Sequence, residues 1–127
     1  MTTSQLEQIL SDYNTDLDIE LKTSEMYDFD FDIDQYLADY LEDLTEDMND
    51  DETSRVYKYM YNKAHKMTTA EKQRLRKLQN NLTYGRGVFL EAWPELIELR
   101  KKDLISRNEN PYNYDLEARS LMKKFNA

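Results

Sequence analysis

Four aspartates recur at every second position close to residue 30. They are Asp28, Asp30, Asp32 and Asp34. Closely spaced carboxylates are ligands that Ca²⁺ prefers, but a calcium loop that begins at Asp28 needs Gly at its sixth position and Glu at its twelfth. Those two positions hold Ile33 and Asp39. The spacing therefore does not match an EF-hand, and we expect no metal site.

The same aspartates have a second interpretation as an imitation of a polyanion. In an extended chain, alternate side chains lie about 6.6–6.8 Å apart, which is similar to the spacing of phosphates on a nucleic-acid strand. Further acidic residues follow at Asp39, Glu42, Asp43, Glu46 and Asp47. A basic nucleic-acid groove would be attracted to such a surface, because complementary potentials steer association. The alternative is a solvated acidic edge that discourages strand pairing.

Charge is divided along the chain. Residues 1–54 hold 18 acidic residues and one basic residue, Lys22, which gives −17. Residues 55–127 hold 16 basic and 8 acidic residues, which gives +8 and a total of −9. Such asymmetry indicates a charged partner or pairing between the two parts of the chain. Even complete internal pairing leaves a negative surface.

Basic residues are densest at positions 55–77. The cations are Arg55, Lys58, Lys63, Lys66, Lys72, Arg74, Arg76 and Lys77, with Tyr57, Tyr59 and Tyr61 among them. Basic and aromatic residues together can bind single-stranded nucleic acid through phosphate contacts and stacking. The competing interpretation is that these cations face the acidic helix predicted at about 32–48 of the same molecule. The nearby acidic segment favours this second interpretation.

No other pattern indicates a catalytic, metal or cofactor site. His65 is the only histidine and there is no cysteine, so neither a zinc site nor a disulfide is expected. Gly85 and Gly87 form half of a dinucleotide-binding fingerprint, but they follow a helical pattern and are better explained as a helix break. Carboxylates are plentiful, and none is distinguished as a general acid or base. We therefore predict a protein without enzymatic activity or a cofactor.

Helical periodicity supplies the elements that position these residues. Apolar spacing predicts helices at about 4–14, 32–48, 51–66, 68–82, 89–106 and 114–125. Ser4 with Glu7, and Thr68 with Glu71, have the spacing of capping boxes. Asp32 is a predicted N-cap, with Phe31 and Tyr36 placed for a hydrophobic staple. Pro94 interrupts the fifth helix unless it lies in the first turn.

Residues 15–31 are the hardest segment to assign. Leu17, Ile19 and Leu21 alternate with acidic residues, as do Phe29 and Phe31. A period of two indicates a strand, yet Asp is a poor strand former. A β-hairpin across residues 22–28 and extended segments packed on the helices both remain open.

The expected fold is mainly α, a single domain of residues 1–127 with four to six helices and an optional minor N-terminal β-hairpin. Only two Gly and two Pro occur, which disfavours a β fold with many turns. Residues 1–5 have no signal-peptide character, and the apolar stretch at 88–90 is far too short to span a bilayer. We expect a cytoplasmic protein with no membrane partner.

The predicted function is non-enzymatic protein binding, with residues 28–52 as the recognition face and a basic, nucleic-acid-handling protein as partner. The chain is small and acidic, contains no cysteine and has ten tyrosines. In these features it resembles phage-encoded inhibitors, including DNA-mimic anti-restriction and anti-CRISPR proteins. That resemblance implies action in the cytoplasm of a host cell. Two alternatives are a structural or assembly component, such as a virion or scaffold adaptor that forms homo-oligomers, and a nucleic-acid-binding protein that uses residues 55–77.

Overall fold

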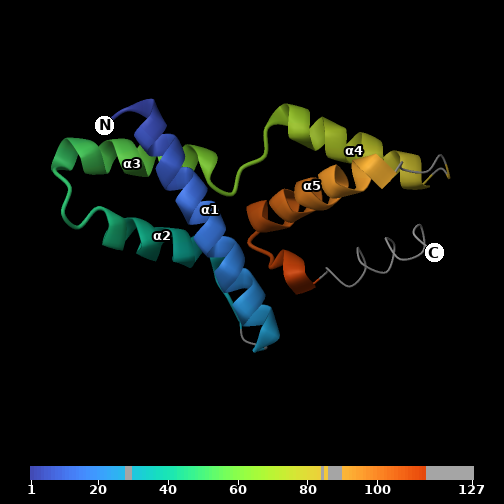
Figure 1. The fold of residues 1–127 in the computed structure, drawn as a ribbon, viewed down its shortest axis with the longest axis horizontal. Coiled ribbons are helices and arrows are strands. Elements are labelled where there is room, and N and C mark those ends of the chain that lie inside the picture. Colours follow the sequence, from blue (N-terminus) through green and yellow to red (C-terminus); the bar gives the residue numbers. More distant parts are fainter. Residues whose placement is uncertain (28–29, 84, 86–89, 114–127) are drawn as a thin grey trace. The chain divides into compact units, whose positions relative to one another are not determined.

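The computed structural model describes residues 1–27, 30–83, 85 and 90–113. This part of the chain contains five α-helices, two short 3₁₀ helices and no β-strand (Figure 1). The predicted mainly α fold with four to six helices is therefore confirmed. Contacts divide the chain into two compact units, Met1–Ala64 and His65–Ala127, here called unit 1 and unit 2.

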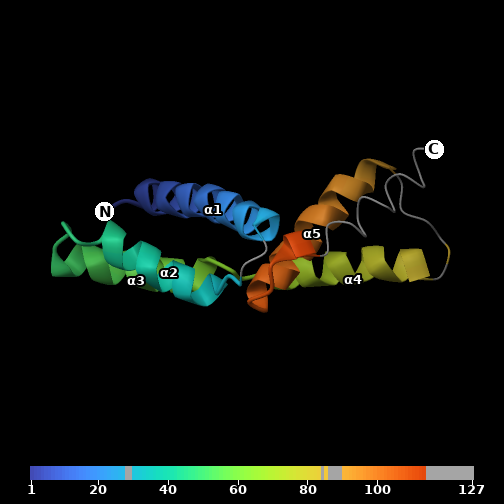
Figure 2. The same cartoon turned by 90° about the horizontal axis from the view of Figure 1, so that it is seen from below.

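Unit 1 contains three helices in two layers. They are α1 (Thr3–Met26), α2 (Ile33–Leu44) and α3 (Asp50–Lys63). Helix α1 lies on one side, and α2 and α3 lie together on the other (Figure 2). The core between the layers consists of Tyr13, Leu17 and Leu21 from α1, Ile33, Leu37 and Leu41 from α2, and Val56 and Met60 from α3. Each layer thus buries one apolar stripe against the other.

The β-hairpin is absent from the described residues, because residues 15–26 continue α1 instead of leaving it near Asn14. Tyr13, Leu17, Leu21 and Ser24 are all buried, at spacings of four, four and three residues. That spacing places them on one helical face. Ile19, which completed the apparent strand alternation, is 56% exposed. The extended alternative for residues 15–26 is wrong for the same reason.

The caps explain where the helices of unit 1 begin. Thr2, and not Ser4, caps α1: its Oγ1 accepts from the Gln5 N–H at 3.2 Å, and Gln5 Oε1 accepts from the Thr2 N–H at 2.8 Å. Asp32 caps α2 as predicted, with Oδ1 accepting from the Gln35 N–H at 3.1 Å. Asn49 caps α3 through the Glu52 N–H at 2.8 Å. Each cap satisfies a backbone donor that the helix itself leaves unpaired.

Unit 2 is built on a pair of consecutive helices. They are α4 (Thr69–Thr83) and α5 (Trp93–Ser106), with 3₁₀ helices at Leu90–Ala92 and Pro111–Asn113. The predicted capping box is confirmed, since Thr68 Oγ1 accepts from the Glu71 N–H at 3.1 Å and Glu71 Oε1 accepts from the Thr68 N–H at 3.0 Å. The core contains Met67, Leu75 and Leu78 against Trp93, Leu96 and Leu99. Burial of these faces against each other holds α4 to α5.

Pro94 and Gly85 mark the start of α5 and the end of α4. Pro94 lies in the first turn of α5, so it removes no helical hydrogen bond and does not interrupt the helix. Gly85 has φ of +70°, a left-handed conformation that favours glycine and supports the predicted helix break after α4. The predicted helix at 114–125 and Gly87 lie outside the described residues. No described helix combines the length and the apolar character needed to cross a membrane.

Candidate acidic binding surface on α2

The predicted site residues fall into three short stretches. Asp30 and Asp32 precede α2, whereas Asp34, Asp39, Glu42 and Asp43 belong to α2, and Glu46 and Asp47 lie in the turn that follows it. All eight are exposed, and Asp28 lies outside the described residues. Because α2 begins at Ile33, Asp34 is helical and the extended alternation ends at Asp32. The regular spacing of about 6.6–6.8 Å between alternate carboxylates therefore does not extend to Asp34.

Three carboxylates gather on the solvent side of α2. At 100° per residue, Asp39, Glu42 and Asp43 lie opposite the buried stripe of Ile33, Leu37 and Leu41. We call these three residues the acidic face. No Lys or Arg occurs between residues 30 and 54. Nothing of opposite charge on α2 or its flanking turns therefore neutralises the acidic face.

Aromatic side chains hold α2 against α1. The Tyr13 ring centroid lies 5.0 Å from that of Tyr40 and 5.8 Å from that of Tyr36. The Phe31 and Tyr36 centroids are 5.4 Å apart, which agrees with the predicted staple. Tyr13 is completely buried, and Tyr36 and Tyr40 are half-buried. We call Tyr13, Tyr36 and Tyr40 the tyrosine platform, because they fix the helix that carries the acidic face.

The tyrosine platform stays protonated at neutral pH. Burial raises the pKa of Tyr40 to about 12, and the nearby Asp16 carboxylate adds to the effect. Asp16 Oδ2 also accepts a hydrogen bond from the Tyr40 hydroxyl at 3.3 Å. Burial is also the main cause of the raised pKa of Tyr36 and of Tyr13. Sequence reasoning missed the platform, although Tyr36 and Tyr40 have the four-residue spacing of one helical face.

Two members of the acidic face lie where the helix dipole opposes them. Glu42 and Asp43 are in the last turn of α2, which contains no basic residue. The C-terminal end of a helix carries partial negative charge and favours cations. In α3, by contrast, Asp50, Asp51 and Glu52 occupy the first turn, where the dipole favours anions. The acids of α3 thus have a structural explanation that Glu42 and Asp43 lack.

Neutralising the last turn of α2 should therefore stabilise unit 1. We expect Glu42→Gln with Asp43→Asn to raise the free energy of unfolding by about 0.3–1 kcal/mol per residue at low salt. Urea denaturation followed by far-UV circular dichroism measures this gain, which should shrink as salt screens the charges. A lower midpoint of denaturation for the double variant would show that the two carboxylates stabilise the fold.

The basic segment 55–77 does not form one element. Arg55, Lys58 and Lys63 lie on α3 in unit 1, whereas Lys72, Arg74, Arg76 and Lys77 lie on α4 in unit 2. Unit 1 contains 18 acidic and four basic residues, and unit 2 contains eight acidic and 13 basic residues. Their formal charges are −14 and +5. Tyr57, Tyr59 and Tyr61 belong to α3, so the interleaved aromatics and the densest cations lie in different units.

Ion pairs are present inside each unit. Among the described residues, however, none of these pairs joins a cation of residues 55–77 to the acidic helix α2, although the internal-pairing interpretation predicted such pairs. In unit 1, Arg55 Nε lies 3.5 Å from Asp51 Oδ2, and Lys22 Nζ lies 3.0 Å from Asp18 Oδ2. In unit 2, Arg74 contacts Glu95 through two hydrogen bonds of 2.8 and 3.1 Å. These cations neutralise carboxylates on α1, α3 and α5, and none of those carboxylates belongs to the acidic face.

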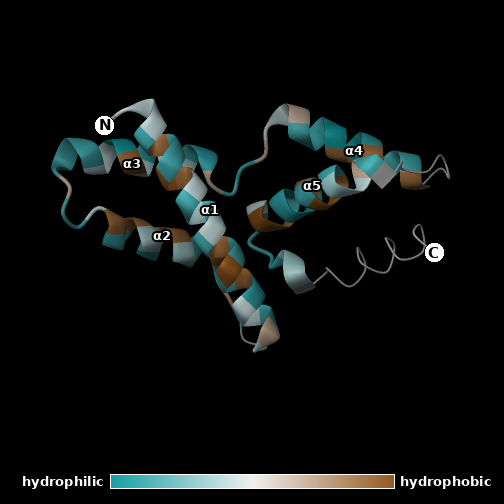
Figure 3. Ribbon diagram, viewed as in Figure 1, coloured by the Kyte–Doolittle hydropathy of each residue, from teal (hydrophilic) through white to brown (hydrophobic). Residues whose placement is uncertain are grey.

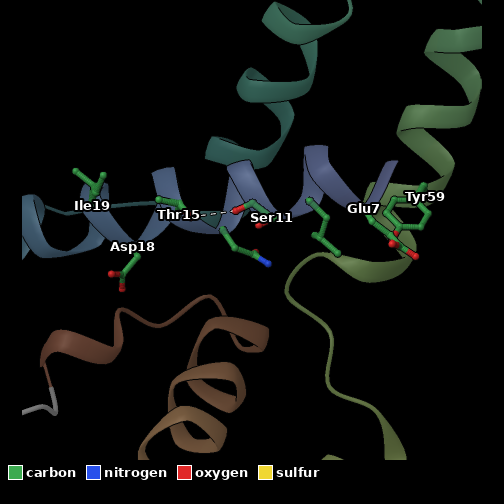
Figure 4. Close-up of a pocket in the computed structure, with 8 residues that line it drawn as sticks. Glu7, Ser11, Thr15, Asp18, Ile19 and Tyr59 are labelled. Carbon is green, nitrogen blue, oxygen red and sulfur yellow. Dashed lines mark hydrogen bonds between the residues drawn. The ribbon is translucent and has the colours of Figure 1, made fainter. Parts of the chain in front are cut away.

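An open hollow runs along α1 beside Tyr59 of α3 (Figure 4). Its lining residues are Glu7, Leu10, Ser11, Asn14, Thr15, Asp18, Ile19 and Tyr59. The Thr15 hydroxyl donates to the Ser11 carbonyl at 3.1 Å. Glu7 and Asp18 are 11 positions apart on α1, which corresponds to about 16 Å along the helix axis. That exceeds the separation of about 5–9.5 Å at which carboxylate pairs cleave glycosides, so the hollow offers no such acid–base pair.

The described residues offer no alternative metal centre. Within residues 1–27, 30–83, 85 and 90–113, no group of three or more His, Asp or Glu side chains is arranged to hold a metal ion. Comparisons with protein-family models, curated proteins and solved structures return no match to this chain. The functional assignment therefore rests on the acidic face and on the tyrosine platform beneath it.

Proposed function

We propose that this chain is a non-enzymatic binding protein, an inhibitor or accessory protein whose acidic face engages a basic patch on another protein. The observation that carries the proposal is the exposure of Asp39, Glu42 and Asp43 on a helix that contains no cation. Two of these carboxylates oppose the helix dipole and so reduce the stability of α2. Residues that reduce stability without a structural benefit are expected at functional surfaces.

The tyrosine platform supports this role because it makes the acidic face rigid. Tyr13 and Leu37 are buried, and Leu41 is completely inaccessible to solvent, so α2 cannot rotate without opening the core. A fixed array of like charges presents one potential to an approaching partner. Matched potentials raise the association rate by about 10–10³-fold, and the effect falls steeply with ionic strength.

The partner class follows from the charge of unit 1. A formal charge of −14 on 64 residues is best matched by an extended basic surface, such as the groove of a nucleic-acid-handling enzyme or complex. The proposal therefore includes nucleic-acid mimicry of the kind used by phage-encoded anti-restriction and anti-CRISPR proteins, acting in the host cytoplasm. Because the extended spacing does not reach Asp34, the helical acidic face and the turn at Glu46 and Asp47 would carry this mimicry.

Variants in which three carboxylates are replaced by neutral amides test the acidic face directly. The test variant is Asp39→Asn, Glu42→Gln and Asp43→Asn, and the matched control is Glu7→Gln, Glu20→Gln and Glu25→Gln on α1, where all three residues are exposed. Both variants change the net charge by the same amount. We expect the test variant to capture about tenfold less partner from native-host lysate at low salt, because steering charge is lost. Quantitative mass spectrometry at two salt concentrations gives the readout.

Two outcomes would contradict the proposal. Equal capture by the wild type and the test variant at low salt would remove the acidic face as the binding site. Equal loss in the test and control variants would show that net charge alone governs binding. The mimicry itself predicts that an added DNA duplex displaces the captured protein. If the captured protein stays bound when the duplex is added, its binding surface is not a nucleic-acid groove.

Exposed apolar residues on α1 favour a second candidate function in assembly. Ile19 is 56% exposed and Met26 is 75% exposed. They are seven positions apart and therefore share one helical face. A structural or scaffold component would use such a stripe to associate with further copies. Size-exclusion chromatography with light scattering separates the two functions, because a defined large oligomer of the isolated chain favours assembly.

A further inference from the structure

The outward side of α4 carries a row of cations. Lys72, Arg76 and Lys77 are exposed, whereas Leu75 and Leu78 are buried against α5. We call Lys72, Arg76 and Lys77 the basic face. In Figure 3 the ribbon of α4 is mainly hydrophilic, which agrees with a helix that buries only a narrow stripe. Lys72 and Arg76 are one helical turn apart, about 6 Å along the axis.

The basic face differs from four other cations of unit 2, which form internal ion pairs. Arg74 pairs with Glu95, and Lys102 pairs with Glu71. Lys101 Nζ lies 3.8 Å from Glu98 Oε1, and Arg107 pairs with Asp103. In the described part of unit 2, no ion pair is recorded for Lys72, Arg76 or Lys77. Their charge is therefore available to an external anion.

Side-chain amides complete the surface. Arg76 and Lys77 line an open hollow together with Gln73, Asn80 and Asn81. Gln73 precedes Lys77 by one turn, and Asn80 follows Arg76 by one turn. Charged groups and amides are both common donors to the phosphate oxygens of nucleic acids, and amides also bind base edges. The hollow contains no carboxylate.

We propose that the basic face of α4 binds the phosphate backbone of a double-stranded nucleic acid. The sequence of α4, Thr69–Thr83, contains no aromatic residue, so it lacks the stacking surface that proteins use for single strands. A 15-residue helix is about 22 Å long and can follow a groove or a backbone. This inference concerns unit 2 and a different ligand, so it goes beyond the acidic face and its protein partner.

Salt dependence measures the phosphate contacts. The assay uses the full chain with a fluorescein-labelled DNA duplex, and in parallel an RNA duplex, by fluorescence anisotropy between 50 and 200 mM NaCl. Three phosphate contacts predict a slope of about −2.7 for the logarithm of the binding constant against the logarithm of salt, or about 40-fold weaker binding at the higher salt. The slope is preferred to the affinity itself because the negative unit 1 lowers affinity through long-range repulsion. The two duplexes distinguish DNA from RNA as the source of the phosphates.

A pair of matched variants locates the contacts. Arg76→Gln with Lys77→Gln should reduce the magnitude of the slope by about two, one for each lost contact. The control, Lys58→Gln with Lys63→Gln, removes the same charge from exposed positions on α3 and should leave the slope unchanged. Far-UV circular dichroism verifies that both variants stay helical.

Several results would overturn the proposal. No binding to either duplex at 50 mM NaCl excludes it, and so does an equal effect of the two variants. Tighter binding to a single strand than to a duplex would exclude the double-stranded ligand. A further outcome is that the chain does not bind duplex but self-associates in a salt-sensitive way, and that the α4 variant abolishes this self-association. The ligand of the basic face would then be an acidic protein surface. The acidic-face variant should still bind duplex, so this inference and the proposed function fail independently.

Discussion

Tyr13→Ala should unfold unit 1 under conditions in which the wild type is folded. Tyr13 is completely buried and contacts the rings of Tyr36 and Tyr40 at centroid distances of 5.8 and 5.0 Å. Removing a buried aromatic ring costs about 3–5 kcal/mol through lost transfer energy and the cavity left behind. That is most of the stability of a small domain, about 5 kcal/mol at the low end. Urea denaturation followed by circular dichroism measures the loss.

Two further variants make the Tyr13 result interpretable. Tyr13→Phe keeps the ring, so it should cost only the contribution of a hydroxyl group, about 1 kcal/mol. Tyr27→Ala removes the same side chain where it is 69% exposed, and should change stability by less than about 0.5 kcal/mol. If Tyr13→Ala were as stable as Tyr27→Ala, Tyr13 would not contribute to the core of unit 1.

Unit 1 should unfold at a lower alkaline pH than a comparable domain whose tyrosines are all exposed. In the unfolded chain tyrosine ionises near pH 10, whereas in the folded chain burial raises the pKa of Tyr40 to about 12 and that of Tyr13 further. The stabilisation is therefore complete below pH 10 and is lost as pH rises through 12. Tyr13 alone contributes a decline of about 1.4 kcal/mol per pH unit in this range, because only the unfolded state has released its proton.

Tyrosinate absorbance and helicity, recorded against pH, test this expectation together. Loss of helix should coincide with a late, cooperative rise in tyrosinate absorbance. Tyr13→Phe with Tyr40→Phe should flatten the pH dependence of the free energy of unfolding above pH 10, whereas Tyr61→Phe, at a residue 47% exposed, should not. Identical pH dependence in all three proteins would mean that these tyrosines ionise equally easily in both states.

The sequence predicted those elements whose signals are local. Asp32 and Thr68 were recognised as caps because a cap and its N3 residue lie three positions apart, and the structure contains both sets of hydrogen bonds. Pro94 was consistent with a first turn, where the structure places it. The exposure of the acidic face also followed from composition, because unpaired carboxylates are rarely buried.

The length of α1 could not be predicted, because two periods fit the same residues. Leu17, Ile19 and Leu21 satisfy a strand period, while Tyr13, Leu17 and Leu21 satisfy a helical one. Burial against α2 and α3 decides between them by covering Leu17 and Leu21 and leaving Ile19 exposed. That choice depends on residues more than ten positions away, which no local pattern contains.

The tyrosine platform was also missed for a physical reason. Ten tyrosines occur in the chain, and only tertiary packing selects Tyr13 for complete burial. The charge changes sign after residue 54, but the units divide between Ala64 and His65. Helix α3 spans the charge boundary, with Asp50 in its first turn and Lys63 in its last, which is the order that the helix dipole favours.

The two cores differ in how they can form during folding. In unit 2, Leu75 and Leu78 contact Trp93 and Leu96 from the next helix along the chain. Closing the short connection between these two helices is therefore enough to form the core of unit 2. In unit 1, α1 packs against α3, which follows only after the whole of α2. Contacts of greater sequence separation form more slowly. During synthesis, α2 can cover the apolar stripe of α1 only in part until α3 has left the ribosome, and this interval is when the nascent chain is most exposed to chaperones and to aggregation.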